Sequence, residues 1–193
     1  MRKFGAVIFL FLILAQGTAL GSETETLIFP EDYVWIQVTD QSDAENYLQE
    51  WVREGEKAEE AKWLLVKQKL QLPKKQSSKK YIKSIFKLAR SSCSDVLYNG
   101  PEKLPLDSGA KVYVGRIMCA QQINQPYGSF TDMSVLVEGT SAYVFTSELR
   151  IPPSPKAGIL SFDNGSDADV KAFMADQAAS ARIVRSNAST LAE

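Results

Sequence analysis

Two hydrophobic periods run along this chain, and they predict strands in some segments and helices in others. Short runs rich in β-branched and aromatic residues, bounded by polar turns, are typical of strands. Such runs predict strands at 32–39, 62–72, 95–98, 111–121, 131–138 and 142–151. The sequence "EGTS" at 138–141 predicts a turn with Gly139 at positive φ, and Pro152, Pro153 and Pro155 end the sheet.

The segment 43–54 fits both periods. As a strand over 46–54 it would pair with 32–39 across the polar turn "DQSDAE". As a helix it would begin at "SDAE" (42–45), which fits a capping box, and would place its aromatic and aliphatic side chains on one face. Periodicity alone does not separate the two interpretations.

The clearest helical pattern is "SSKKYIKSIFKLARSS" (77–92). Its apolar positions recur at helical spacing, at Tyr81, Ile82, Ile85, Phe86 and Ala89. Its cations fall on the other face, at Lys80, Lys83, Lys87 and Arg90. Ser77 or Ser78 can cap the start of this helix.

A second helix is predicted after the acidic loop "SFDNGSDAD" (161–169), with Asp167 or Asp169 as its cap. Its inner stripe would consist of Val170, Phe173, Met174, Gln177, Ala181 and Val184. A run of strands with one helix between them and one helix at the end indicates an α+β fold. We expect an antiparallel sheet with both helices packed on it.

The start of the chain, "MRKFGAVIFLFLILAQGTALGS", has the pattern of an export signal. Arg2 and Lys3 precede a short apolar run, and small residues follow it. We expect cleavage after Ala19 or Gly21, with an uncleaved anchor as the alternative. Removal of residues 1–21 leaves 172 residues, which we expect to form a single exported domain, 22–193, that is periplasmic or secreted. No later segment is apolar enough to cross a membrane.

Export bears on the two cysteines, Cys93 and Cys119. In an oxidising compartment two cysteines usually form one disulfide, whereas a Cys-x-x-Cys redox motif is absent. We therefore expect a disulfide that joins the end of the first helix to the centre of the sheet, and a free or reactive thiol is the alternative. With two thiols and no histidine the chain lacks the ligands of a typical metal site, so we expect no metal and no cofactor.

Charge is sorted along the chain. Residues 22–60 hold twelve acids against Arg53 and Lys57, residues 61–94 hold ten bases and no acid, and residues 95–193 have a net charge of −3. Sorting of this kind indicates either two complementary regions that dock within the fold or a surface for an anionic partner. Lys79 and Lys80 lie in the first helical turn, where the helix dipole makes a cation unfavourable by a few tenths of a kcal/mol.

The cations of the helix, Lys80, Lys83, Lys87 and Arg90, are therefore the candidate binding residues. Candidate partners in a cell envelope are anionic lipid headgroups, acidic polysaccharide and an acidic protein patch. Nucleic acid ranks below these partners, because export removes the chain from most of it and no aromatic stacking motif accompanies the lysines.

No catalytic group stands out. The usual general base, histidine, is missing, and the acids are scattered without a spacing that selects a pair. A small hydrolase that uses paired carboxylates or a Ser–Lys pair remains the alternative to a non-catalytic module. The loop 163–169 resembles a calcium loop but has Met174 where an EF-hand needs an acid. "NGS" (164–166) and "NAS" (187–189) match glycosylation acceptors.

Three stretches in order resemble a family of small uncharacterised bacterial exported proteins. They are "EWVREGEKAEEAKWLLVKQ" (50–68), "ARSSC" (89–93), and "VGRIMC" (114–119) with "GSFTDMSVLVEGTSAYVFTSELRIPP" (128–153). In that family a "GE" turn precedes a tryptophan-led strand, and a cysteine after the helix matches one in a later strand.

The resemblance implies a PsbP-like fold, a strand rather than a helix at 43–54, and a pairing of Cys93 with Cys119. It implies no reaction, and PsbP-like domains mostly act as accessory and binding modules. Because fold analogy alone is weak evidence for function, the basic segment carries the functional hypothesis. We expect a non-enzymatic exported accessory or binding module with an anionic partner.

Overall fold

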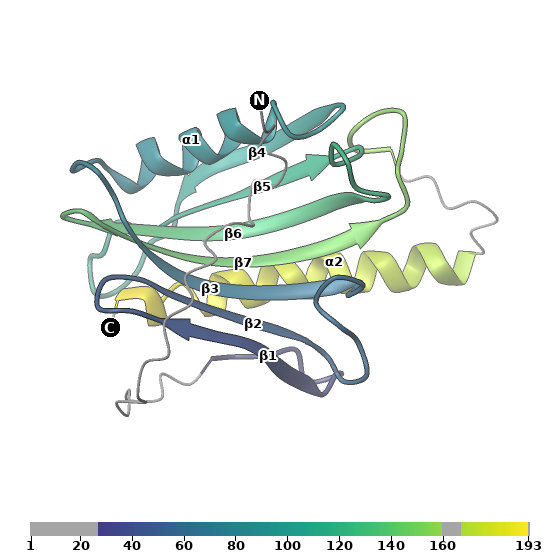
Figure 1. The fold of residues 1–193 in the computed structure, drawn as a ribbon, viewed down its shortest axis with the longest axis horizontal. Coiled ribbons are helices and arrows are strands. Elements are labelled where there is room, and N and C mark those ends of the chain that lie inside the picture. Colours follow the sequence, from purple (N-terminus) through teal and green to yellow (C-terminus); the bar gives the residue numbers. More distant parts are fainter. Residues whose placement is uncertain (1–26, 160–166, 193) are drawn as a thin grey trace.

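The computed structural model describes residues 27–159 and 167–192, which form one antiparallel sheet and two α-helices (Figure 1). The strands are β1 (Trp35–Ser42), β2 (Tyr47–Arg53), β3 (Trp63–Gln71), β4 (Val96–Lys103), β5 (Tyr113–Cys119), β6 (Gly128–Glu138) and β7 (Ser141–Ile151). The helices are α1 (Ser78–Ala89) and α2 (Asp167–Ser186), followed by the short 3₁₀ helix η1 (Thr190–Ala192). The predicted α+β class, with one helix between strands and one near the C-terminus, is confirmed.

The strand order is β1-β2-β3-β7-β6-β5-β4. Each consecutive pair of strands is hydrogen-bonded except β3 and β4, which lie in different parts of the sheet. Helix α1 makes this connection and carries the chain from the middle of the sheet to its far edge (Figure 1). Strands β1 and β2, which belong to the acidic segment 22–60, and the basic helix α1 are therefore placed towards opposite edges of one sheet.

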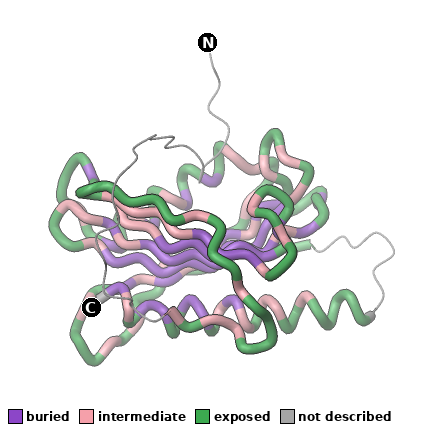
Figure 2. Tube along the Cα trace, turned by 60° about the horizontal axis from the view of Figure 1, so that its bottom comes forward, coloured by how far each residue is buried: buried purple, intermediate pink, exposed green. Residues whose placement is uncertain are grey.

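The two helices cover opposite faces of the sheet. Each central strand contributes to both interfaces, because successive side chains along a strand point to opposite faces. On β6 and β7, Met133, Val135 and Val144 pack with the buried residues of α1. Their neighbours Leu136 and Phe145 pack on the other face with α2. Figure 2 shows the resulting band of buried residues through the central strands.

The ambiguous segment 43–54 is strand β2, which pairs with both β1 and β3, so the helical alternative is wrong. The stretch 42–45, expected to form a capping box, forms part of a turn instead. The Asp43 carboxylate accepts hydrogen bonds from the backbone N–H groups of Glu45 (2.8 Å) and Asn46 (2.7 Å). These bonds also lower the pKa of Asp43. Asp and Asn turns compete with helix caps for the same residue types, which explains the ambiguity.

The predicted inner stripe of α2 is wrong at Val170 and Met174, which are 38% and 52% exposed. The start of α2 extends past the end of the sheet (Figure 1). Other members of the stripe face the core as predicted, since the Phe173 ring contacts Phe130 of β6 and Val184 is buried. The predicted cap residue Asp169 lies within the helix, which begins at Asp167.

Cys93 and Cys119 form the predicted disulfide, with their Cα atoms 5.6 Å apart, within the usual range of about 4.4–6.8 Å. Cys93 follows α1 directly, and Cys119 ends β5. Since β5 is the neighbour of the edge strand β4, the bond lies near an edge of the sheet and not at its centre. It fixes the end of α1 to the strands that the helix covers.

Candidate anion-binding site

Helix α1 is held in one orientation by both of its ends and by its apolar face. The Ser77 side chain caps the helix by accepting a hydrogen bond from the Lys80 N–H (3.2 Å). Ser78 accepts one from the backbone N–H of Val137 on β6 (2.9 Å). Ile82 is fully buried against the sheet. The candidate cations on the opposite face are therefore fixed in direction.

Close packing beneath α1 requires a glycine on β5. A Cβ atom at Gly115 would lie 2.7 Å from Cζ of Phe86 and 3.2 Å from Cδ1 of Ile82. A contact of 2.7 Å is shorter than carbon atoms tolerate, so a larger residue would displace the Phe86 ring or the helix. Gly115 thus leaves room for the tip of the Phe86 ring between helix and strand.

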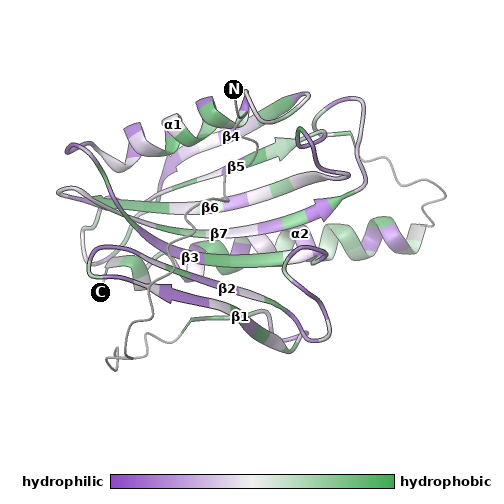
Figure 3. Cartoon of the chain, in the orientation of Figure 1, coloured by the Kyte–Doolittle hydropathy of each residue, from purple (hydrophilic) through white to green (hydrophobic). Residues whose placement is uncertain are grey.

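The four predicted cations of α1 form what we call the basic stripe, Lys80, Lys83, Lys87 and Arg90, and all four are exposed. At helical spacing they fall within about 80° of one another around the axis and span about 15 Å along it. Lys79 extends the stripe at its start, and Lys74 and Lys75 are exposed in the preceding loop. Figure 3 shows the hydrophilic outer side of the helix.

Among the described residues the basic stripe has no acidic partner. Helix α1 contacts β4, β5 and β6, whereas β1 and β2, which belong to the acidic segment 22–60, lie beyond β3. Within the described ranges no ion pair includes a residue of the basic stripe. The ion pairs of the described residues include Arg53–Asp176, Arg116–Asp132, Arg150–Glu148 and Arg185–Glu102. The charge that is sorted along the sequence is therefore also separated in space.

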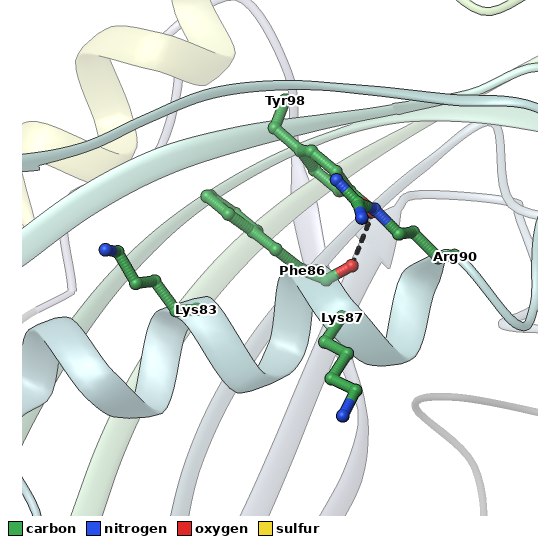
Figure 4. A pocket seen from close by; sticks show the side chains of 5 residues that line it. All are labelled: Lys83, Phe86, Lys87, Arg90 and Tyr98. Atoms are coloured by element: carbon green, nitrogen blue, oxygen red, sulfur yellow. Dashed lines mark hydrogen bonds between the residues drawn. The ribbon is translucent and has the colours of Figure 1, made fainter.

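At the end of the stripe, three side chains form an ordered stack. The rings of Phe86 and Tyr98 lie parallel, with centroids 4.9 Å apart and planes at 17°. The guanidinium carbon of Arg90 lies 5.3 Å from the centroid of the Tyr98 ring. Tyr98 donates a hydrogen bond to the backbone carbonyl of Phe86 (2.6 Å) and accepts one from Arg90 Nε (3.2 Å) (Figure 4).

This stack lines a shallow open hollow of about 320 Å³, which we call the Tyr98 hollow. Its lining consists of Lys83, Phe86, Lys87, Arg90 and Tyr98, so it contains three cations and no acid. Lys83 and Arg90 flank Phe86, and Lys87 extends from the outer side of the helix (Figure 4). The arrangement can attract and orient an anion.

Several buried or half-buried acids elsewhere form hydrogen bonds or ion pairs. Arg116 makes two hydrogen bonds with Asp132 (2.7 and 2.9 Å), and Ser180 of α2 donates a third (2.7 Å). Glu148 accepts from Arg150 (2.9 Å), and buried Glu50 accepts from Thr39. The bonds around Asp132 connect β5, β6 and α2. Among the described residues no group of three or more cysteines and acids is placed to hold a metal ion.

The two predicted glycosylation acceptors have different outcomes. Asn164 and most of the calcium-like loop lie outside the described residues. Asn187 is fully buried, and its amide donates to the carbonyl oxygens of Ile28 and Ile183 and accepts from the Ile28 N–H. This amide fixes the segment around Ile28 to the end of α2, so it is not accessible to a glycosyltransferase in the folded protein.

The sequence pointed to the cations of the site but not to its aromatic part. Phe86 belongs to the predicted apolar face of the helix, and Tyr98 ends the predicted strand 95–98. Only the pairing of β4 with β5 brings Tyr98 beside α1, through its partner Ile117. A juxtaposition set by strand register has no local signal in the sequence.

Neither described helix has the length and apolar character needed to cross a membrane. The predicted signal segment, 1–21, lies outside the described residues. No model of a known protein family matches this chain, and no curated protein is similar to it in sequence.

Proposed function

We propose that this protein is an exported accessory or binding module without catalytic activity, and that its basic stripe associates with an anionic membrane surface. The observation that carries the proposal is the stripe itself. Lys80, Lys83, Lys87 and Arg90 project from one side of a firmly docked helix without an acidic partner among the described residues. Clusters of four to eight cations on an amphipathic helix are typical of proteins that bind anionic lipids.

An exposed apolar residue favours a lipid surface over an acidic polysaccharide. Leu88 of α1 is 51% exposed and lies at the border of the basic stripe, about 100° around the helix axis from Lys87. Interfacial helices combine cations with apolar side chains that enter the boundary between headgroups and acyl chains. An acidic polysaccharide or an acidic protein patch would offer this apolar side chain less apolar surface to contact.

The proposed location and family rest on separate support. The disulfide between Cys93 and Cys119 fits an oxidising compartment, and the predicted signal would deliver the chain there. The antiparallel sheet, with α1 between β3 and β4 and α2 after β7, is compatible with a PsbP-like fold. We propose that fold as the family relationship and draw no activity from it.

Vesicle co-sedimentation of the mature protein tests the proposal. Each cation near an anionic surface contributes up to about 1 kcal/mol, so the four together should retain the protein on phosphatidylglycerol vesicles at low salt. Binding should fall steeply between about 0.05 and 0.3 M salt, because screening shortens the range of the interaction. Replacement of all four by glutamine should abolish it without unfolding the protein.

The control removes a similar amount of charge from the other helix. Lys171, Arg182 and Arg185 are exposed on α2, and their replacement by glutamine should leave vesicle binding within about twofold of the original protein. Equal losses in both variants would show that net charge alone drives association. Absence of binding by the original protein at low salt would refute the proposal, and retention on an acidic polysaccharide or protein column would then identify the partner class.

A further inference from the structure

We infer that the Tyr98 hollow is a discrete subsite for a phosphate group, so that α1 recognises one headgroup in addition to the charged surface as a whole. This inference rests on the proposed function and names the chemistry of the partner. A uniform cationic surface would attract anionic lipids without any ordered site. Three features of the structure support a subsite, namely the fixed guanidinium of Arg90, the cations beside it and the apolar floor of the hollow.

Arg90 is held in place before any ligand arrives. Its Nε donates to the Tyr98 hydroxyl, and its guanidinium lies over the Tyr98 ring. Tyr98 is in turn fixed by its bond to the Phe86 carbonyl and by the parallel Phe86 ring. Since these contacts already restrict the side chain, a ligand loses less affinity to the ordering of Arg90. None of them uses the two terminal nitrogens of the guanidinium, which can donate together to one anion.

Two lysines add positive charge around the hollow, and their side chains extend in different directions from α1 (Figure 4). Lys83 and Lys87 line the hollow with Arg90, and none of the three forms an ion pair with a described residue. Three cations around one hollow exceed what a single carboxylate neutralises. A phosphate monoester carries a charge of about −1.5 to −2 at neutral pH and offers three acceptor oxygens. The balance of charge and donors therefore favours phosphate over carboxylate.

The floor of the hollow is apolar. The Phe86 and Tyr98 rings form it, and neither presents an acid that would repel an anion. A phosphate that carries a short organic group, such as glycerol, can place that group on the ring edges while its oxygens contact the cations. The site thus fits a phosphate on a lipid headgroup or a free phosphate, and the experiment separates these two sources.

The main test compares two variants with equal loss of charge. Lys83→Gln/Arg90→Gln removes two cations that line the hollow, and Lys79→Gln/Lys80→Gln removes two neighbours that do not. On vesicles with phosphatidic acid, whose phosphate is a monoester, the hollow pair should weaken binding roughly tenfold more than the control pair, because it removes charge-assisted hydrogen bonds as well as surface charge. Equal losses would overturn the subsite and leave the proposed function standing.

A second experiment adds inorganic phosphate or glycerol 3-phosphate to the ¹⁵N-labelled protein at constant ionic strength. The chemical shifts of the amide signals report the binding. Shifts confined to residues 83–90 and 96–99, absent in the hollow pair, would support the subsite and show that it accepts free phosphate. If the vesicle difference persists without these shifts, the subsite requires the lipid headgroup. Shifts spread over all exposed lysines, together with equal vesicle losses, would contradict the inference.

A conservative pair of variants separates the ordered arginine from its charge. Tyr98→Phe keeps the ring stack and removes the hydroxyl that holds Arg90, and Arg90→Lys keeps the charge and removes the fork. Both should lose about three- to tenfold on phosphatidic acid vesicles while retaining their binding to phosphatidylglycerol vesicles of equal charge. Full retention on both lipids would mean that the fixed guanidinium has no role in recognition.

Discussion

The two helices pack on opposite faces of one sheet, yet they present very different surfaces to solvent. Helix α1 contains four lysines and no acid, and Arg90 directly follows it. Helix α2 mixes the two signs, with Asp167, Asp169 and Asp176 among Lys171, Arg182 and Arg185. An exposed helix face that serves only solubility can carry charges of either sign. The uniformly positive charge of α1 is therefore the feature that indicates an anionic partner.

The helices also differ in how they are attached. Helix α1 is held by apolar contacts over its whole length and by the disulfide that follows it. Helix α2 is attached from Phe173 onwards, where the Phe173 ring contacts Phe130, Asp176 pairs with Arg53 and Ser180 bonds Asp132. The rigid attachment of α1 keeps its cations in a fixed array. Helix α2, with charges of both signs, presents no comparable array.

Loss of the disulfide should have the largest effect on this contrast. Replacement of both cysteines by serine should lower the free energy of unfolding by roughly 3–4 kcal/mol, because the crosslink restricts the unfolded chain over 26 positions. Urea unfolding measures the loss, and reduction of the original protein should reproduce it. Thiol titration of the denatured, unreduced protein should find no free thiol, and two free thiols would contradict the bond.

Matched alanine substitutions compare the apolar faces of the two helices. Ile82→Ala in α1 should cost about 2–4 kcal/mol, since Ile82 is fully buried between helix and sheet. Met174→Ala in α2 should stay within about 0.5 kcal/mol, because that side chain is 52% exposed. Similar losses at both positions would show that the projecting half of α2 is packed in solution.

A smaller effect is expected at the polar attachment of α2. Asp132→Asn weakens the paired bonds to Arg116 and the bond to Ser180 and should cost about 2 kcal/mol, less than a fully buried pair because Arg116 reaches solvent. Glu102→Gln, in an exposed pair with Arg185, should cost under about 0.5 kcal/mol. If the two losses were equal, the buried contact would not be what holds α2.

Much of the fold could be predicted because local patterns and global packing agree. All six segments predicted as strands are strands, with bounds shifted by a few residues, and α1 matches its predicted apolar face. The pattern failed in α2 because amphipathicity identifies a buried stripe only where a partner surface lies beneath the helix. At 43–54 the stretch "SDAE" (42–45) was ambiguous, because turns and helix caps use the same residue types and similar side-chain bonds.

The candidate site was only half predictable. Its cations follow from helical spacing, since Lys80, Lys83, Lys87 and Arg90 must share a face once the helix forms. The sequence pattern did not determine the strand order, so it left open whether the acidic segment 22–60 lies against these cations. The observed strand order places β1 and β2 at the edge opposite β4. The Tyr98 hollow likewise depends on the register of β4 against β5.

The orientation of the protein on a membrane tests the central claim most directly. Amide signals of the ¹⁵N-labelled mature protein would be recorded with phosphatidylglycerol bicelles that contain a trace of paramagnetic lipid. The account predicts broadening at Lys79–Arg90 and in the adjoining strand β4, with α2, β1 and β2 unaffected at the same protein and lipid concentrations. Broadening centred on the exposed apolar residues Val170 and Met174 of α2, or on β1, would contradict it and assign the contact to another face of the molecule.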